Sequence, residues 1–189
     1  GTLKAGVTGK DVIITLCGLF NSDEVLNHAI EFDGEGVAQL SVDQRLTIAN
    51  MTTEWGALAG VFPVDAVTIA WLRDRAAFVA ARGLEGVPSD TDGGGDHPRM
   101  NAMRITSLEA NPPTADGEAF YAKELTLDLG TVRPHISGPN HVKTMTADSD
   151  LLDRQLKIDT AYLVSCVNSR VEDIAEAADV SEGTLYNYF

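Results

Sequence analysis

Cysteine is scarce in this sequence, and its scarcity excludes a fold held together by disulfides. Only Cys17 and Cys166 occur among the 189 residues, and their sequence surroundings differ. Small secreted domains that depend on disulfides carry several cysteines in a regular framework. The two cysteines therefore favour a chain that folds in a reducing compartment.

Basic residues and long apolar runs are also few. Lys and Arg total 14 against 28 Asp and Glu, so the net charge is −14. The sequence contains no run of Lys or Arg residues that would form a basic patch. Such a surface repels phosphate backbones, which disfavours a nucleic-acid partner. No apolar stretch reaches the roughly 18 residues that span a membrane, and the N-terminus has no signal-peptide pattern. Because the chain starts at Gly1 without a Met, we expect upstream sequence to have been removed.

Apolar residues make up 44% of the chain, which is enough to build a core. Short β-branched or alternating runs predict strands, and apolar residues at helical spacing predict helices. The alternation favours an α/β fold with a largely parallel sheet and flanking helices. Strands are predicted at 11–20, 119–132 and 160–165, and helices at 23–32, from Ser41 to about Gly60, at 63–83 and at 170–178.

The clearest local signal is at Ser41, which with Gln44 forms a capping-box pattern at the start of a helix.

The composition also predicts a division of the chain. Residues 1–84 form one α/β segment and residues 100–178 a second. Gly, Pro, Asp and Ser dominate residues 85–99, which predicts a flexible linker or loop between them.

Asn50 and Glu54 form the first candidate site. They are four residues apart in a predicted helix, so both project from one face. Side by side, an amide and a carboxylate can hold a water or a substrate hydroxyl, because one donates and the other accepts. The alternative is an ordinary solvated polar stripe.

The second candidate site is the loop after the predicted strand 160–165. Cys166 lies there at a strand-to-helix turn, where α/β proteins bind ligands. Its thiolate would suit metal ligation, and Asn168, Ser169 and Arg170 would supply donors to a carboxylate ligand. A buried structural cysteine is the alternative. For Cys17, inside an apolar run, the structural role is the prediction.

Neither the histidines nor the acidic, Gly-rich run predicts a metal site. The histidines at 28, 97, 135 and 141 lack metal-site spacing and are interpreted as surface or capping residues. The acidic, Gly-rich run within residues 85–99 lacks the 12-residue loop and closing Glu of a calcium site.

Four segments together resemble the aconitase family of iron–sulfur hydro-lyases, and within it the homoaconitases. They are "GKDVIITLCGLFNSDEVLNHAIEFDGEGV", "VDQRLTIANMTTEWGALAGVFPVD", "YAKELTLDLGTVRPHISGPNHVK" and "AYLVSCVNSRVEDIAEAA", within residues 1–178. The resemblance implies a reversible dehydration and hydration of a tricarboxylic 2-hydroxy acid in lysine biosynthesis. It also implies a 4Fe–4S cluster whose open iron acts as a Lewis acid. The implied location is the mitochondrial matrix in a eukaryote and the cytoplasm otherwise.

The same resemblance assigns residue roles. It makes Cys166 the first of three cluster ligands, and it places Asn50 and Glu54 beside the cluster and the substrate oxygen. Asn168, Ser169 and Arg170 would surround the cluster and the substrate. The family's later Cys-x-x-Cys pair and its Asp-Ser-His motif are absent, and Val167 replaces a threonine. We therefore expect these 189 residues alone to hold no stable cluster and to show no hydratase activity.

The C-terminal residues 171–189, "VEDIAEAADVSEGTLYNYF", resemble the helix-turn-helix of tetracycline-repressor-type regulators. We place the boundary of this tail at residues 179–189. A DNA-binding regulator is thus the alternative function, and an inert folded domain is another. The strongly negative charge of the chain opposes operator binding.

Overall fold

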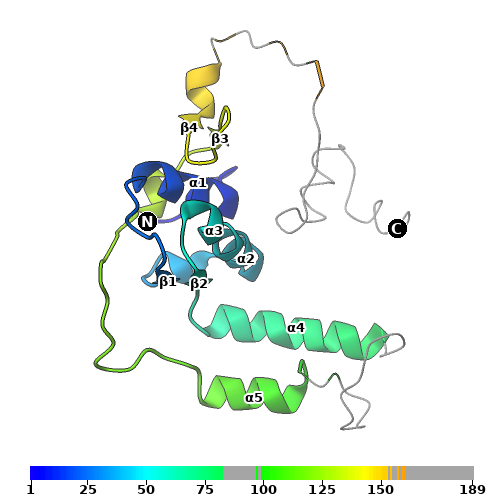
Figure 1. Cartoon of the computed structure of the whole chain (residues 1–189). Coiled ribbons are helices and arrows are strands. Elements are labelled where there is room, and N and C mark those ends of the chain that lie inside the picture. Colours follow the sequence, from blue (N-terminus) through cyan, green and yellow to red (C-terminus); the bar gives the residue numbers. More distant parts are fainter. Residues whose placement is uncertain (83–96, 98, 153, 155–156, 158, 161–189) are drawn as a thin grey trace.

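The structure is a computed structural model, which describes residues 1–82, 97, 99–152, 154, 157 and 159–160 (Figure 1). Its core surrounds the N-terminal helix. Buried apolar side chains from the helices after it and from residues near 130 complete that core. The cluster comprises Val7, Val12, Ile13, Leu16, Cys17, Val25, Leu40, Ile48, Met51, Trp55, Ala57, Leu129 and Val132.

The central element is helix α1 (Gly9–Leu19), so the predicted strand at 11–20 is wrong. A uniformly apolar run does not distinguish a buried strand from a buried helix, because neither period is visible in it. Hydrogen bonds at the N-terminus of the segment favour the helix. The Asp11 carboxylate accepts hydrogen bonds from the Thr8 backbone N–H (2.8 Å) and hydroxyl (3.0 Å). This contact fixes the first turn of a helix.

Asp11 also joins α1 to a distant hairpin. Its second carboxylate oxygen accepts the His135 backbone N–H at 2.9 Å, and the Thr15 hydroxyl lies 3.3 Å from His135 Nδ1. His135 begins strand β3 (His135–Ser137), which pairs antiparallel with β4 (Met145–Ala147). The hairpin therefore lies against α1, as Figure 1 shows.

The parallel pair of strands is β1 (Ala29–Glu31) and β2 (Ala59–Val61), so the predicted helix at 23–32 is wrong. Asp23 and Asn27 have φ values of 62° and 60°, in the left-handed region. Such residues end a right-handed helix rather than continue it. The chain then leaves the turn as a strand.

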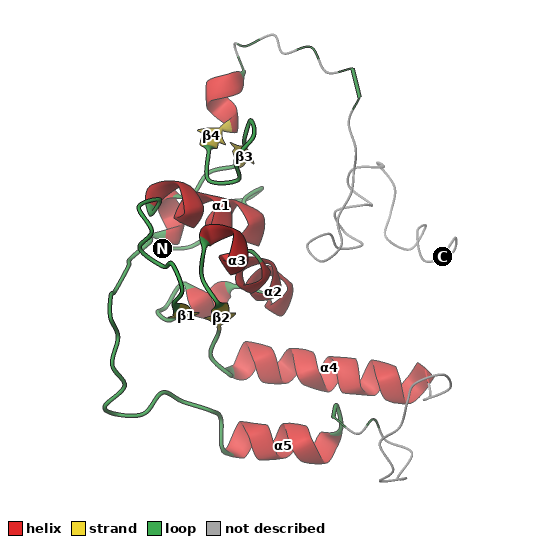
Figure 2. Ribbon diagram, viewed as in Figure 1, coloured by secondary structure: helices red, strands yellow, loops and turns green. Residues whose placement is uncertain are grey.

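Between β1 and β2 the chain forms a short 3₁₀ turn (Val37–Gln39), helix α2 (Val42–Asn50) and helix α3 (Thr52–Trp55). The capping box is confirmed: the Ser41 Oγ accepts the Gln44 N–H, and the Gln44 Oε1 accepts the Ser41 N–H. Helices crossing between parallel strands confirm the α/β class. Of the two described sheets, one is parallel and the other antiparallel (Figure 2).

Helices α4 (Ala66–Arg82) and α5 (Ala102–Ala110) lie side by side beyond β2. The helix predicted at 63–83 is confirmed, with Asp65 accepting the Thr68 N–H at its start. The strand predicted at 119–132 is wrong. That segment contains only the 3₁₀ turn Leu129–Thr131, although Leu125 and Leu127 pack on the core. A further 3₁₀ turn spans Asp148–Leu151.

Arg45 fastens α2 to the start of α4. Its side chain is only 4% exposed, and its guanidinium forms a two-pronged ion pair with Asp65 at 2.9 and 2.7 Å. The remaining contacts are the carbonyls of Val37, Leu40 and Pro63 and the Thr68 hydroxyl. A buried guanidinium is stable only when acceptors such as these partner its N–H groups, because an unpartnered buried charge is costly.

Within the described residues, none of the helices combines the length and the apolar character needed to cross a membrane. The predicted linker 85–99 falls mostly on residues outside the described part, as do the strand at 160–165, the helix at 170–178 and the tail at 179–189. The division into 1–84 and 100–178 stays a prediction.

Replacing Arg45 by Ala should destabilise the fold strongly, because it removes the ion pair with Asp65 and the guanidinium donors to the buried carbonyls of Val37 and Leu40. We expect a loss of about 3 kcal/mol in the free energy of unfolding measured in urea. Arg104→Ala, at an exposed position of α5, is the matched control and should change it by less than about 0.5 kcal/mol. Equal losses in both variants would contradict the role of Arg45.

The same ion pair predicts a pH dependence. Hydrogen bonds from Arg45 hold the pKa of Asp65 at about 2, below its ordinary 3.8. A depressed carboxyl pKa stabilises the fold above pH 3.8, and this contribution disappears as the pH falls to about 2. The stability difference between the original chain and Asp65→Asn should therefore shrink over that interval in urea titrations. Asp116→Asn, at an exposed loop position, controls for the lost charge, and a constant difference for Asp65→Asn would contradict the prediction.

Candidate functional site

The structure places Asn50 and Glu54 on either side of a helix junction. Asn50 is the last residue of α2, and Glu54 lies in α3. The helical hydrogen-bond pattern continues through the junction, because Met51 donates to Thr47 O and Trp55 donates to Met51 O, both at 3.3 Å. The backbone thus passes from α2 into α3 with little interruption, and both residues are exposed. That the two side chains share one side stays a prediction.

Thr53 is the polar neighbour that sequence reasoning missed at this junction. Its hydroxyl lies 2.8 Å from the Glu54 Oε2 and 3.1 Å from the Asn50 carbonyl oxygen. A hydroxyl has one proton, so it donates to one of these acceptors at a time. Within the part of the chain that the structure describes, this hydroxyl is the hydrogen-bond partner of the Glu54 side chain, which leaves its other carboxylate oxygen available to a ligand.

Buried residues on the other side hold the junction rigid. Thr52 is completely buried and its hydroxyl donates to the Ala49 carbonyl at 2.8 Å. Trp55 is 2% exposed, and its indole N–H donates to the Phe20 carbonyl at 2.8 Å. Gly60 in β2 permits close packing here, since a Cβ on it would lie 2.9 Å from the Thr52 methyl carbon.

Cys17 is completely buried in α1, as its structural interpretation predicted, although it lies in a helix rather than a strand. Burial raises the pKa of its thiol to about 11, against a smaller lowering by Lys143 and a further rise caused by Glu54. A buried protonated thiol is a poor metal ligand. No local sequence signal singled out Lys143.

His97 and His141 cap backbone N–H groups, as the interpretation predicted, whereas His135 is half-buried against Thr15 of α1. His97 Nδ1 accepts the backbone N–H groups of Arg99 and Met100, and His141 Nδ1 accepts that of Lys143. Among the residues that the structure describes, there is no group of three or more His, Cys, Asp or Glu able to hold a metal ion.

The second candidate site lies outside the described residues. It consists of Cys166, Asn168, Ser169 and Arg170, and the structure does not place these side chains relative to Asn50 and Glu54. Their roles stay predictions. The donor set itself can be judged from the sequence, which contains two cysteines, one of them buried and protonated. A cluster held by three thiolates does not fit this set of donors.

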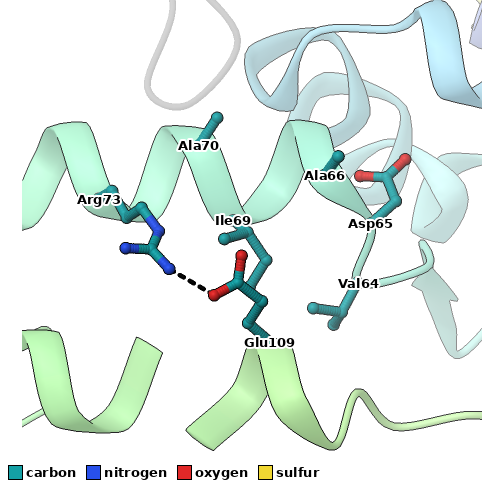
Figure 3. A pocket seen from close by; sticks show the side chains of 7 residues that line it. All are labelled: Val64, Asp65, Ala66, Ile69, Ala70, Arg73 and Glu109. Atoms are coloured by element: carbon teal, nitrogen blue, oxygen red, sulfur yellow. Dashed lines mark hydrogen bonds and ion pairs between the residues drawn. The ribbon is translucent and has the colours of Figure 1, made fainter. Parts of the chain in front are cut away.

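A separate hollow lies between α4 and α5, with a volume of about 340 Å³. It is lined by Val64, Asp65, Ala66, Ile69, Ala70, Arg73 and Glu109. Arg73 and Glu109 form an ion pair across it, as Figure 3 shows. Asn50 and Glu54 are not part of its lining, so it is distinct from the candidate site.

The comparisons with known proteins agree over nearly the whole chain. A profile of the aconitase family (aconitate hydratase) matches residues 1–186. The mitochondrial homoaconitase of Cryptococcus neoformans is 57% identical over 185 residues, which cover 97% of this chain and 25% of that protein. The corresponding protein of Debaryomyces hansenii is 51% identical over 183 residues, with the same coverage. The protein of Emericella nidulans is 56% identical over 182 residues, or 95% of this chain and 23% of that protein.

Two facts follow from these matches. The chain spans about a quarter of the length of the curated relatives it matches. The family match also includes most of residues 171–189, where the helix-turn-helix resemblance was found, and no comparison supports the DNA-binding alternative. Those residues lie outside the described part.

The burial of Cys17 can be tested by thiol labelling. In a Cys166→Ser background, the native chain at pH 8 should react with a maleimide at least about a hundredfold more slowly than the urea-unfolded chain. A pKa raised from 9.0 to about 11 lowers the thiolate fraction by that factor, and burial slows access further. Similar native and unfolded rates would show that Cys17 is accessible. Mass spectrometry of the labelled peptide gives both rates.

Proposed function

This chain belongs to the aconitase family, and from that membership we propose that it forms part of a hydro-lyase of the homoaconitate hydratase type. The reaction would be the reversible removal and addition of water on a tricarboxylic 2-hydroxy acid, as a step of lysine biosynthesis. The observation that carries the proposal is the 50–57% identity to homoaconitases along nearly the whole chain, including both candidate sites. The named location of these relatives supports the mitochondrial matrix if the source is eukaryotic.

Asn50 and Glu54 are the described residues that we assign to the chemistry. Both lie exposed at the junction of α2 and α3, and among the described residues the hydrogen bond to the Glu54 carboxylate comes from the neutral Thr53 hydroxyl. A carboxylate in this state can accept a hydrogen bond from a substrate hydroxyl or take up its proton. The Asn50 amide can donate to a substrate carboxylate oxygen or hydroxyl at the same time.

The remaining assignments fall on the loop at 166–170. Asn168, Ser169 and Arg170 would bind substrate carboxylates, because guanidinium, hydroxyl and amide groups match carboxylate oxygens. Cys166 would supply one thiolate ligand to the 4Fe–4S cluster of the family, which in bound form provides a Lewis acid for the leaving hydroxyl. The other thiolates would come from polypeptide beyond these 189 residues, since Cys17 is buried and protonated.

Cluster binding gives one direct test. After anaerobic reconstitution with iron and sulfide, we expect this chain alone to show no stoichiometric iron–sulfur absorbance, because a cubane cluster needs three thiolates at one site. A broad charge-transfer band that co-purifies with four irons per chain would contradict this expectation. Cys166→Ser serves as the comparison for adventitious iron.

The catalytic role of Glu54 can be tested in a complete enzyme. The quarter of the Cryptococcus neoformans homoaconitase that matches this chain is replaced by residues 1–186, and hydration of homoaconitate is assayed. We expect activity, and a fall in kcat of about a hundredfold or more in Glu54→Gln, as expected for a lost acid–base group. Glu118→Gln, at an exposed loop position, is the control and should keep full activity. A cluster-containing, folded chimera that is inactive, or insensitive to Glu54→Gln, would refute the proposal.

A further inference from the structure

The hydroxyl of Thr53 connects the two candidate residues of the α2–α3 junction. It lies 2.8 Å from the Glu54 Oε2 and 3.1 Å from the Asn50 carbonyl oxygen. Adjacent side chains on a regular helix point about 100° apart, so a contact between them does not follow from their spacing. The Glu54 side chain therefore folds back over the preceding residue, where one of its two carboxylate oxygens meets the hydroxyl.

The Thr53 side chain is itself restrained. A β-branched side chain has few allowed χ1 rotamers in a helix, and a threonine hydroxyl there commonly contacts a carbonyl three or four residues earlier. Asn50 supplies that carbonyl, three positions back. The same junction is fixed from below by the hydrogen bonds of buried Thr52 and Trp55. The core thus restrains the Thr53 hydroxyl through the backbone.

The Glu54 carboxylate is the better of the two acceptors for the single hydroxyl proton. Hydrogen bonds to an ionised carboxylate are about twice as strong as those to a neutral carbonyl, and this contact is also the shorter one. The terminal torsion of a glutamate is broad, so an unrestrained carboxylate takes many orientations. The hydrogen bond to Oε2 reduces this freedom. Within the described part of the chain, Oε1 is then the oxygen available to a ligand.

We propose that Thr53 is the positioning residue of Glu54: its hydroxyl holds Oε2, so that Oε1 is the oxygen that meets the substrate hydroxyl. When the proton of that hydroxyl moves to Oε1, Oε2 becomes the carbonyl oxygen of a carboxylic acid, which still accepts the Thr53 hydrogen bond. The bond can therefore persist through the proton transfer. The proposal rests on the proposed function, because it needs Glu54 to act on a substrate.

The test uses the Cryptococcus neoformans homoaconitase chimera that carries residues 1–186. Thr53→Val keeps the shape of the side chain and removes the hydroxyl. We expect kcat to fall about tenfold while KM changes less than about twofold, because orientation is lost and substrate binding is not. Thr53→Ser retains the hydroxyl and should restore most of kcat. Thr114→Val makes the same chemical change at an exposed loop position and should leave kcat unchanged.

A double-mutant cycle separates the orientation of Glu54 from a general structural role. With Glu54→Gln in place, Thr53→Val should lower kcat less than about twofold further, because Thr53 acts through the carboxylate. An equal loss in both backgrounds would overturn the proposal, as would an unchanged kcat in Thr53→Val or a Thr53→Ser variant as slow as Thr53→Val. An unchanged kcat in Glu54→Gln would refute the catalytic role of Glu54 itself, so the two failures are distinguishable.

The hydrogen bond can also be measured in the isolated chain, without activity. Glutamate is labelled at its carboxyl carbon for NMR, and the Glu54 resonance is assigned by its loss in Glu54→Gln. Removing a hydrogen-bond donor changes the chemical shift of a carboxylate carbon. This resonance should therefore move in Thr53→Val and stay in place in Thr53→Ser and Thr114→Val. A resonance that Thr53→Val leaves in place would overturn the proposal, whether or not the chimera is active.

Discussion

The contact on which most of this architecture depends is the guanidinium of Arg45 enclosed by oxygen acceptors. An arginine that is 4% exposed cannot remain buried unless its N–H groups are partnered, because the cost of desolvating a charge would exceed the gain from packing. Here the partners come from three segments: the 3₁₀ turn before α2, the residues that precede α4 and the first turn of α4. Moving α4 relative to α2 would break several of these hydrogen bonds together. The start of α4 is therefore held against α2 by the hydrogen bonds of this side chain.

A second buried charge performs the same task at the other end of the core. The Asp11 carboxylate closes the first turn of α1 through Thr8 and also accepts the backbone N–H of His135, 124 positions away in the sequence. A single carboxylate thus starts a helix and fixes a hairpin on it. Between these two polar anchors lie the apolar side chains of α1, α2 and α3, including Ile13, Ile48 and Trp55. The junction that carries Asn50 and Glu54 is built on this packed layer, which limits how far either side chain can shift.

The sequence predicted those features that are decided locally and missed those decided at a distance. The capping box of Ser41 and Gln44 and the helix beginning after Asp65 depend on neighbours within four residues, and both were found. The segment 11–20 was mistaken for a strand because its surroundings are apolar on every side, which removes the periodicity. The strand at 29–31 depends on a partner about thirty residues later, which no local pattern reveals. Residues 125 and 127 do alternate inward, yet they form no strand because the described residues beside them supply no ladder.

The same distinction applies to the candidate site. Spacing alone predicted that Asn50 and Glu54 lie on one side, because a helical turn brings residues four apart together. It did not single out Thr53, although the hydrogen bonds of its hydroxyl to the Asn50 carbonyl and to Glu54 are local. It also did not predict the electrostatic effect of Glu54 and Lys143 on the pKa of the Cys17 thiol, which depends on tertiary structure. The chemistry of the aconitase family needs several thiolates beside such a carboxylate, and the described residues offer one thiol, buried and protonated. Under the proposed function, these 189 residues would contribute the carboxylate of Glu54 and the amide of Asn50, and Cys166 would supply one of the thiolates.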